Sequence, residues 1–275
     1  MSDINEVGAT AFFIAGIREQ EKNREHPLFK DPYAEWFVND DIRQKVGQVF
    51  ALLPEGMELV RYRSALFDDI IRREIERGMR QIVILGSGFD MRPHVFEDEG
   101  VRFCDVDQPA VLAFKGKVLE GHGMTPCAGI PCNYLEADLP AELAKAGFDL
   151  NAPILIIWEG NTMYLPEDLI YGFLNRLREG VQSFRIAFDF FARSVIDRTT
   201  GDENITATTD AFENTLNVKW VTGFDGLSVV EERTGLKTVE SGSLLDFGKR
   251  VAPDYPTDIP QLELYLYGIM SHGAD

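Results

Sequence analysis

The residues most able to do chemistry lie where an apolar segment ends in glycine. The segment Gln81-Ile82-Val83-Ile84-Leu85 is followed by Gly86-Ser87-Gly88-Phe89-Asp90, a change that predicts a buried strand turning into a ligand-binding loop. A second apolar segment ends in Asp105-Val106-Asp107, which puts Asp107 19 positions after Gly88 (107 − 88). Nucleoside-binding α/β folds present a carboxylate to ribose hydroxyls at a spacing of ~20 residues. The two features together predict a nucleoside cofactor and therefore an enzyme.

The loop also indicates which nucleoside cofactor it suits. A Gly-x-Gly turn alone is weak evidence, because glycine is common wherever a strand ends. The third glycine of the dinucleotide pattern is missing, and Asp90 and Met91 stand in that part of the loop. A pyrophosphate beside the Asp90 carboxylate would be repelled, which disfavours NAD. A cofactor with a positive charge and no phosphate fits better, and S-adenosylmethionine has both properties.

Three carboxylates follow predicted strands, and for two of them a structural role competes with a functional one. Asp107 can accept hydrogen bonds from both ribose hydroxyls, or it can cap the helix predicted to begin near Pro109. Asp138 can accept from the exocyclic amine of adenine, or it can cap a helix near Pro140. Glu159 ends the most apolar predicted strand, where ligands bind in open α/β sheets, and a functional role is expected for it.

Strand and helix patterns alternate through the middle of the chain, which predicts a doubly wound, mostly parallel α/β sheet of seven strands. The first 78 residues form a helical cap, 79–190 the cofactor-binding core, 191–235 a lid-like insert and 236–275 the final strands of what we expect to be a single domain. The predicted strands are 82–85, 101–106, 132–137, 154–158, 184–190, 236–240 and 262–270. The predicted helices lie within 10–37 and at 59–77, 109–120, 141–146 and 166–179.

Composition narrows the classes of function. The formal charge of −18 and the pI near 4.6 argue against a nucleic-acid partner, because phosphate binding draws on clustered Lys and Arg. No secretory signal and no apolar run of ~18 residues is present, so a cytoplasmic protein without a membrane partner is expected. Neither a Ser-His-Asp order nor a His-x-x-x-His pair appears, and no metal site is predicted. The sequence gives no indication of oligomeric state.

Seven short motifs, taken in their order and spacing, resemble the leucine carboxyl methyltransferase family. The resemblance points in particular to its bacterial branch of small-molecule O-methyltransferases, which includes tetracenomycin-type polyketide enzymes. The motifs are Thr10-Ala11 with Arg18, Asp31-Pro32-Tyr33-Ala34, Arg61-Tyr62-Arg63, Gln81 to Arg92, Asp105 to Pro109 with Lys115, Ala137-Asp138-Leu139, and Glu159 to Leu165.

The resemblance implies a class I methyltransferase, Rossmann-like fold and S-adenosylmethionine as cofactor. It implies that Arg63, helped by Arg18, meets the methionyl carboxylate, and that Glu159 approaches the methionyl amino group or the sulfonium. The loop of Gly86, Ser87 and Gly88 would pass beneath the cofactor and Asp107 would hold the ribose. Asp138 and Leu139 would bracket the adenine. Asn161 and Thr162 depart from the family, which has apolar residues there.

The predicted activity is methyl transfer to a carboxylate or hydroxyl oxygen of a small metabolite such as a polyketide. A carboxylate acceptor is ionised at neutral pH and needs no general base, whereas a hydroxyl acceptor needs help. Tyr164 either contacts the acceptor or packs as an aromatic wedge. Two alternatives stay open: methylation of a protein C-terminal carboxylate, and a nucleoside-binding protein without catalytic activity.

Overall fold

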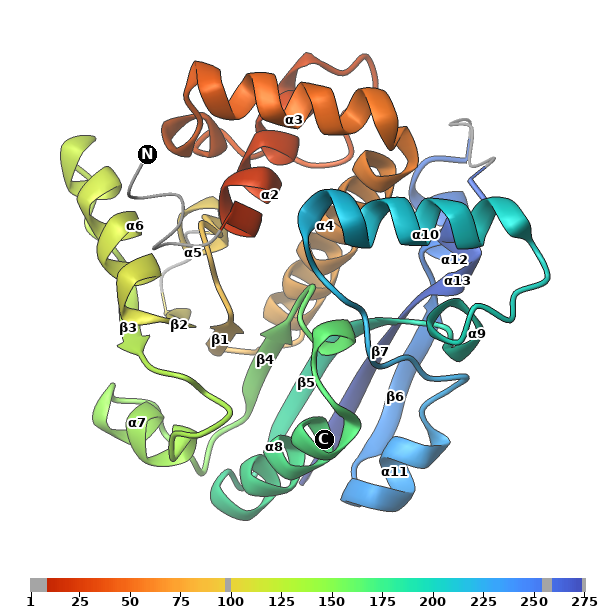
Figure 1. The fold of residues 1–275 in the computed structure, drawn as a ribbon. Coiled ribbons are helices and arrows are strands. Elements are labelled where there is room, and N and C mark those ends of the chain that lie inside the picture. The colour runs from red at the N-terminus through yellow and green to blue at the C-terminus, as the bar shows by residue number, and fades with distance from the viewer. Residues whose placement is uncertain (1–8, 97–99, 254–258, 274–275) are drawn as a thin grey trace.

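The computed structural model describes residues 9–96, 100–253 and 259–273, and a seven-stranded sheet forms its centre (Figure 1). The strand order is β3-β2-β1-β4-β5-β7-β6. Neighbours among β1 to β5 pair in parallel, whereas β7 is antiparallel to both β5 and β6. The prediction of a mostly parallel, doubly wound sheet is therefore confirmed. The strands are β1 (Gln81–Leu85), β2 (Arg102–Asp107), β3 (Ala128–Pro131), β4 (Ile154–Trp158), β5 (Phe184–Phe191), β6 (Lys237–Ser243) and β7 (Tyr265–His272).

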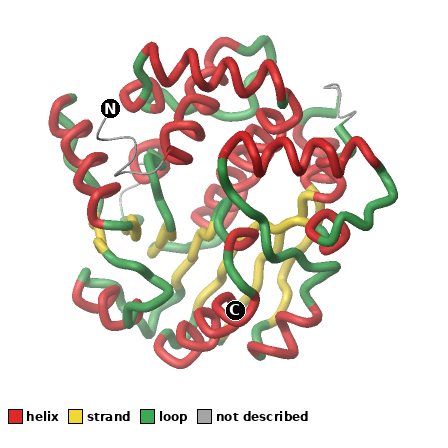
Figure 2. Tube along the Cα trace, viewed as in Figure 1, coloured by secondary structure: helices red, strands yellow, loops and turns green. Residues whose placement is uncertain are grey.

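Helices cover both faces of this sheet, which is the yellow band at the centre of Figure 2. Among the described residues, no helix has both the length and the apolar character needed to cross a bilayer. The helices are α2 (Ala9–Gln20), α3 (Asp40–Leu52), α4 (Pro54–Glu76), α5 (Arg92–Val95), α6 (Pro109–Gly121), α7 (Leu139–Lys145), α8 (Glu167–Gly180), α9 (Arg193–Ile196), α10 (Glu203–Leu216), α11 (Ser228–Thr234), α12 (Leu244–Val251) and α13 (Gln261–Leu264), with short 3₁₀ turns η1 (Glu21–Asn23), η2 (Ala34–Phe37) and η3 (Thr162–Tyr164).

The alternation of side chains along each strand divides the core into two layers. In β1, Ile82 and Ile84 pack with α4 and α12 on one face, whereas Val83 and Leu85 pack with α7, α8 and α11 on the other. β4 is buried along its whole length, as expected for a central parallel strand. The carboxyl ends of β1, β2 and β4 therefore meet at one edge of the sheet, held by apolar packing on both sides.

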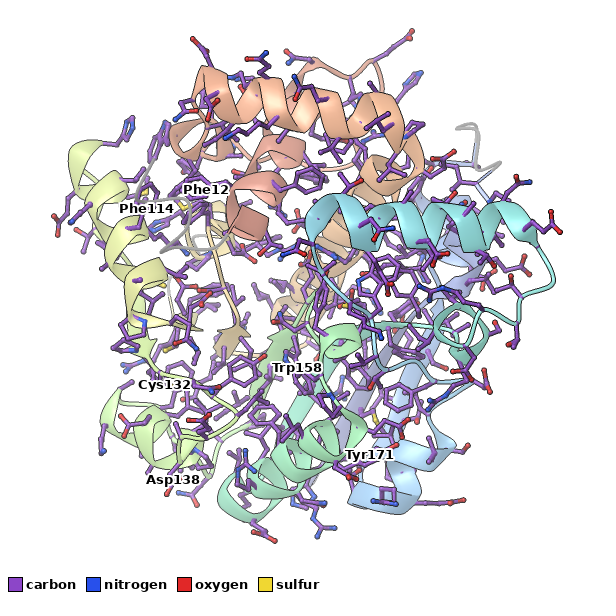
Figure 3. The ribbon with its side chains drawn as sticks, in the orientation of Figure 1. Phe12, Phe114, Cys132, Asp138, Trp158 and Tyr171 are labelled. Atoms are coloured by element: carbon purple, nitrogen blue, oxygen red, sulfur yellow. The ribbon has the colours of Figure 1, made fainter. Side chains whose placement is uncertain are left out.

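A third cluster of buried side chains joins the N-terminal helices to that edge. Phe12 of α2 packs against Phe89 of the loop after β1 and Phe114 of α6, with ring centroids 4.9 and 5.3 Å apart; Figure 3 labels Phe12 and Phe114 where α2 approaches α6. Phe37 of η2 stacks on Phe89 at 4.6 Å. The N-terminal helices thus cap the strand ends.

Three parts of the fold differ from the sequence prediction. The third strand lies at Ala128–Pro131, before the predicted 132–137 segment, which has turn and irregular structure instead. β3 lies at the sheet edge with only Ile130 buried, so it lacks the apolar run that identifies a central strand. The helix α3 was not predicted, and α4 begins at Pro54 rather than at 59. The segment 191–235 contains α9, α10 and α11.

Candidate functional site

The Asp107 carboxylate, at the end of β2, joins that strand to the loop after β1. Gly86 and Gly88 have φ angles of 59° and 51°, a left-handed conformation that glycine adopts without strain. The Gly88 amide donates to Asp107 Oδ2 at 2.7 Å, and the Gln108 amide donates to Asp107 Oδ1 at 2.6 Å. Burial raises the pKa of the Asp107 carboxyl. Each oxygen keeps a free lone pair, which allows a diol to bind.

A cavity of about 250 Å³ lies over this loop, and it collects most of the predicted cofactor residues. Its walls come from α2, α4 and the segments that follow β1, β2 and β4. Seven of the predicted residues line it: Arg18, Arg63, Gly86, Ser87, Gly88, Asp107 and Glu159. The structure therefore brings together side chains that are up to 141 positions apart (159 − 18).

Asp138 and Leu139 lie outside this cavity. Asp138 is exposed, and its Oδ1 accepts from the Ala141 amide at 3.1 Å at the start of α7. Leu139 is buried in the core layer that includes α7 and α8. Figure 3 shows Asp138 beside α7, away from Trp158 at the end of β4. Asp138 thus has the helix-capping role that was one of its two predicted roles, and its contact with adenine stays a prediction.

Glu159 is held between two arginines rather than left free. Arg63 Nε donates to Glu159 Oε1 at 3.0 Å, and Arg92 Nη1 donates to Glu159 Oε2 at 2.7 Å. Burial opposes ionisation of Glu159, but the charges of the two arginines outweigh it and lower its pKa. Arg92 also pairs with Asp90 at 2.6 Å, and burial of Asp90 is likewise outweighed by Arg92, Arg18 and Lys115, so its pKa is lowered. Both carboxylates stay charged at the cavity wall.

Two buried polar atoms of the cavity residues have no hydrogen-bond partner within the described ranges. Arg18 Nε donates to Asp31 Oδ2 at 2.7 Å, but Arg18 Nη2 is buried and unpaired. Ser87 Oγ is also buried and unpaired. Leaving a buried donor without a partner costs ~1–3 kcal/mol. A ligand with acceptor oxygens would satisfy both atoms.

A second cavity, of about 320 Å³, adjoins the first. The two share Thr10, Ile14, Arg63, Gly160 and Asn161 in their walls. The second is lined mainly by apolar and aromatic side chains from α2, α4, η3, β5, α10 and β7: Phe13, Leu59, Met163, Tyr164, Phe191, Phe212, Trp220 and Tyr265 are among them. Tyr164 lies here and not in the first cavity, and burial raises its pKa.

Asn161 and Thr162, which are polar where the family has apolar residues, fix the chain between the two cavities. Asn161 Nδ2 donates to the Glu159 carbonyl at 2.7 Å, and a Cβ added to Gly86 would lie 2.8 Å from the Asn161 amide group. Thr162 Oγ1 donates to the Asp189 carbonyl. Asn161 therefore packs directly on the glycine loop, which explains why the loop has no side chain at that position.

Arg92, Asp189 and Tyr265 belong to the site but were not predicted. Asp189 is fully buried; its Oδ1 accepts from the Gly160 amide at 2.6 Å, and its Oδ2 accepts from the Tyr265 hydroxyl. Arg63 Nη1 donates to Tyr265 Oη at 3.1 Å. One signal was present in the sequence, because Asp189 interrupts the apolar run Ile186-Ala187-Phe188-Asp189-Phe190-Phe191. A carboxylate inside a buried strand is costly unless it is paired.

Comparison with known proteins identifies the family of this chain. A family model described as leucine carboxyl methyltransferase matches residues 11–177. A Mycolicibacterium smegmatis protein is 38% identical over 59% of this chain and 59% of its own length, and a Streptomyces coelicolor protein is 33% identical over 70% and 72%. Both are named as S-adenosyl-L-methionine-dependent methyltransferases, so S-adenosylmethionine is the cofactor that these relatives imply.

One solved structure has the same fold as this chain. A crystal structure from Thermobifida fusca, named as a methyltransferase, superposes with a TM-score of 0.63 over 96% of this chain and 94% of that one, at 17% identity. The sequence match spans about three fifths of the M. smegmatis relative and of one from Mycobacterium ulcerans. Because the family model covers more than half of the chain, this protein belongs to the leucine carboxyl methyltransferase family.

Proposed function

We propose that this protein is an S-adenosylmethionine-dependent O-methyltransferase that acts on a small, largely apolar metabolite. The observation that carries the proposal is the pair of adjoining cavities, one charged and one apolar, which share Arg63, Gly160 and Asn161. Methyl transfer needs donor and acceptor in contact, and a shared wall provides such a contact.

The residues of the charged cavity fit the donor. The donor supplies a sulfonium-bound methyl group. Arg18 Nη2 and Arg63 would hold the methionyl carboxylate, the Asp107 carboxylate would accept from the ribose hydroxyls, and the Gly86–Gly88 loop leaves room for both. Four carboxylates and three arginines line this cavity: Asp31, Asp90, Asp107 and Glu159, with Arg18, Arg63 and Arg92. The excess of negative charge suits a cation and disfavours a pyrophosphate.

The apolar cavity indicates the acceptor class. Its aromatic and aliphatic walls, closed on one side by Phe212 and Leu216 of α10, suit an apolar or aromatic skeleton such as that of a polyketide. They suit a polar peptide C-terminus less well. These walls support the proposal that the protein acts as the small-molecule, tetracenomycin-type enzymes of the family do, with the reacting oxygen of the acceptor near Arg63.

Two measurements test the proposal. Calorimetry should show binding of S-adenosylmethionine and no comparable binding of NAD; a preference for NAD would contradict it. With isotopically labelled donor, a screen against metabolite extracts should then label a small apolar product at oxygen. Donor binding followed by labelling of protein C-termini alone would support the carboxyl-directed alternative instead.

A further inference from the structure

We propose that Tyr265 and Asp189 form a proton relay that takes the proton from a neutral hydroxyl acceptor, so that the acceptor is a phenol, enol or alcohol rather than a carboxylate. This inference rests on the proposed methyltransferase function and deepens it by naming the acceptor group. It arises from two residues outside the sequence motifs: Tyr265 lines the apolar cavity beside Arg63, and Asp189 is buried behind Tyr265.

The position of the pair is the first argument. Tyr265 lines the apolar cavity, and its Oη lies 3.1 Å from Nη1 of Arg63, which lines both cavities. The Tyr265 hydroxyl therefore lies beside the junction where the acceptor oxygen must approach the donor methyl. Asp189 lies behind it, fully buried, and accepts the Tyr265 proton in a hydrogen bond.

The hydrogen-bond directions are the second argument. Arg63 donates to Tyr265 Oη, and Tyr265 donates to Asp189 Oδ2. A phenol oxygen has two lone pairs and one proton, so one lone pair of Tyr265 Oη is left for an acceptor hydroxyl. The Gly160 amide fixes the other Asp189 oxygen at 2.6 Å. The Tyr265 bond to Asp189 thus points a proton toward the carboxylate, whereas Arg63 and the Gly160 amide hold the two residues in place.

The electrostatics agree with these directions. The charged and titratable groups that face Asp189 are Arg63 from α4, Glu159 after β4, Tyr164 in η3 and Tyr265 in β7. Burial raises the pKa of Asp189 to about 6 even though Arg63 opposes the shift, and burial raises the pKa of Tyr265 well above its usual range. At neutral pH the carboxylate is therefore charged and the phenol keeps its proton, the two states that a relay needs before transfer.

The step balances without a further reactant. The acceptor hydroxyl gives its proton to Tyr265 Oη while the Tyr265 proton moves to Asp189 Oδ2. The electron pair of the broken O–H bond stays on the acceptor oxygen, which forms the new bond to the methyl carbon. The S–CH₃ bond breaks and its pair neutralises the sulfonium. Asp189 later releases the proton to solvent. A carboxylate acceptor has no proton to give and would not use this pair.

Tyr265→Phe tests the relay most directly, because it removes only the hydroxyl. The probes are para-cresol, which is neutral at neutral pH, para-nitrophenol, which is substantially ionised there, and benzoate, each with labelled S-adenosylmethionine. We expect methyl transfer to para-cresol to fall by about 100-fold or more, because a general base contributes roughly 10²–10⁴-fold. Transfer to para-nitrophenol should fall much less, because its oxygen is already charged.

Asp189→Asn tests the far end of the relay through the pH profile. In the wild type, kcat for para-cresol should rise through about pH 6 as Asp189 ionises, and this rise should be missing in the variant. Tyr267→Phe is the matched control: it lies two positions along β7, its hydroxyl donates to Glu240 Oε1 at 3.0 Å, and it lines neither cavity. It should methylate para-cresol as the wild type does.

Each outcome decides between the proposals. Equal losses on the two phenols in Tyr265→Phe, no loss on either, or transfer to benzoate alone would overturn the relay. Donor binding by the wild type with no transfer to any neutral phenol would also count against it. Absence of donor binding by calorimetry would instead overturn the methyltransferase function itself. Thermal unfolding of each variant shows whether a loss comes from the fold.

Discussion

Arg63 is the residue on which both cavities depend. Its guanidinium donates to Glu159 and to Tyr265, and it lies 4.0 Å from Asp189. Burial would lower its pKa, but these three neighbours outweigh burial and raise it, so the side chain stays charged. A planar fork with several fixed donors is what this geometry needs, and a lysine ammonium cannot reproduce it. Its carboxylate partners also limit the net positive charge that an incoming sulfonium would meet.

Asp107 and Asp138 give a matched pair of predictions, because only one of them lines the charged cavity. Asp107→Ala should weaken binding of S-adenosylmethionine by roughly 1.5–3 kcal/mol, since charge-bearing hydrogen bonds to the ribose are lost. Asp138→Ala should cost ~1 kcal/mol of folding stability through loss of the α7 cap and leave the dissociation constant unchanged. Calorimetry and thermal unfolding measure the two effects. Equal losses of affinity would show that the cofactor reaches α7.

The buried Asp189 carboxyl makes a second prediction, on stability and pH. Its pKa is raised from 3.8 to about 6 in the fold, so the folded state holds a proton that the unfolded state has released over that interval. Its contribution to stability is present below about pH 4 and is lost as pH rises through about 6, by roughly 3 kcal/mol at 1.36 kcal/mol per pKa unit. Asp189→Asn should lack this loss. Denaturant unfolding from pH 4 to pH 7 compares the two proteins, and parallel stability curves would contradict the prediction.

At the scale of elements, the sequence predicted the strands and helices that a local signal marks, such as an apolar run or a proline at the start of a helix. β1, β4 and β5 are apolar runs buried in the sheet, and α4, α6 and α8 are bounded by Pro at or near their starts. β3 was misplaced because an edge strand with one buried residue has no such run. That error placed Asp138 directly after a strand, whereas Asp138 follows irregular structure and caps α7. The amphipathic α3 also escaped prediction.

The helix α10, which lines one side of the apolar cavity, leads to a prediction about proteolysis. Asp202 caps the start of α10 (Glu203–Leu216), because its Oδ1 accepts from the Asn204 amide at 2.8 Å. Phe212 and Leu216 of α10 line the cavity. Asp202→Ala should weaken the helix by ~1 kcal/mol and speed tryptic cleavage at the exposed Lys219 by about fivefold. Asn39→Ala removes the equivalent cap of α3 and should not affect that cleavage. Equal acceleration by both would indicate global rather than local opening.

The sequence located the ligand loop but not the network around it, and the reason is physical. The glycine turn and Asp107 are separated by 19 positions, a spacing that one βαβ unit fixes. Arg63, Arg92, Glu159, Asp189 and Tyr265 meet only because α4, the loop after β1, β4, β5 and β7 converge. No local periodicity encodes such a meeting. The lone charge of Asp189 in an apolar strand indicated that this carboxylate needs a partner. No nearby residue in the sequence indicated that the partner is Tyr265.

At the scale of the whole molecule, the charged cavity joins two parts of the fold. Its walls come from the N-terminal α2, through Thr10, Ala11, Ile14 and Arg18, and from the ends of β1, β2 and β4. Figure 1 shows α2 above these strand ends, with α10 crossing nearby. A ligand in this cavity contacts both the cap and the sheet, so binding links their stabilities. Separation of the cap from the sheet would remove the site.

This linkage makes a final prediction about the intact protein. A ligand at 100 times its dissociation constant stabilises the folded state by ~2.7 kcal/mol, and a domain of this size gains roughly 2–4 °C in Tm per kcal/mol. Saturating S-adenosylmethionine should therefore raise Tm by roughly 5–10 °C in a single transition, because cap and sheet share the ligand. NAD at the same concentration should leave Tm unchanged, since its pyrophosphate meets the carboxylates of Asp90, Asp107 and Glu159. Separate unfolding of the cap in the presence of S-adenosylmethionine would show that the cofactor binds the sheet alone, and that the N-terminal helices serve the acceptor instead.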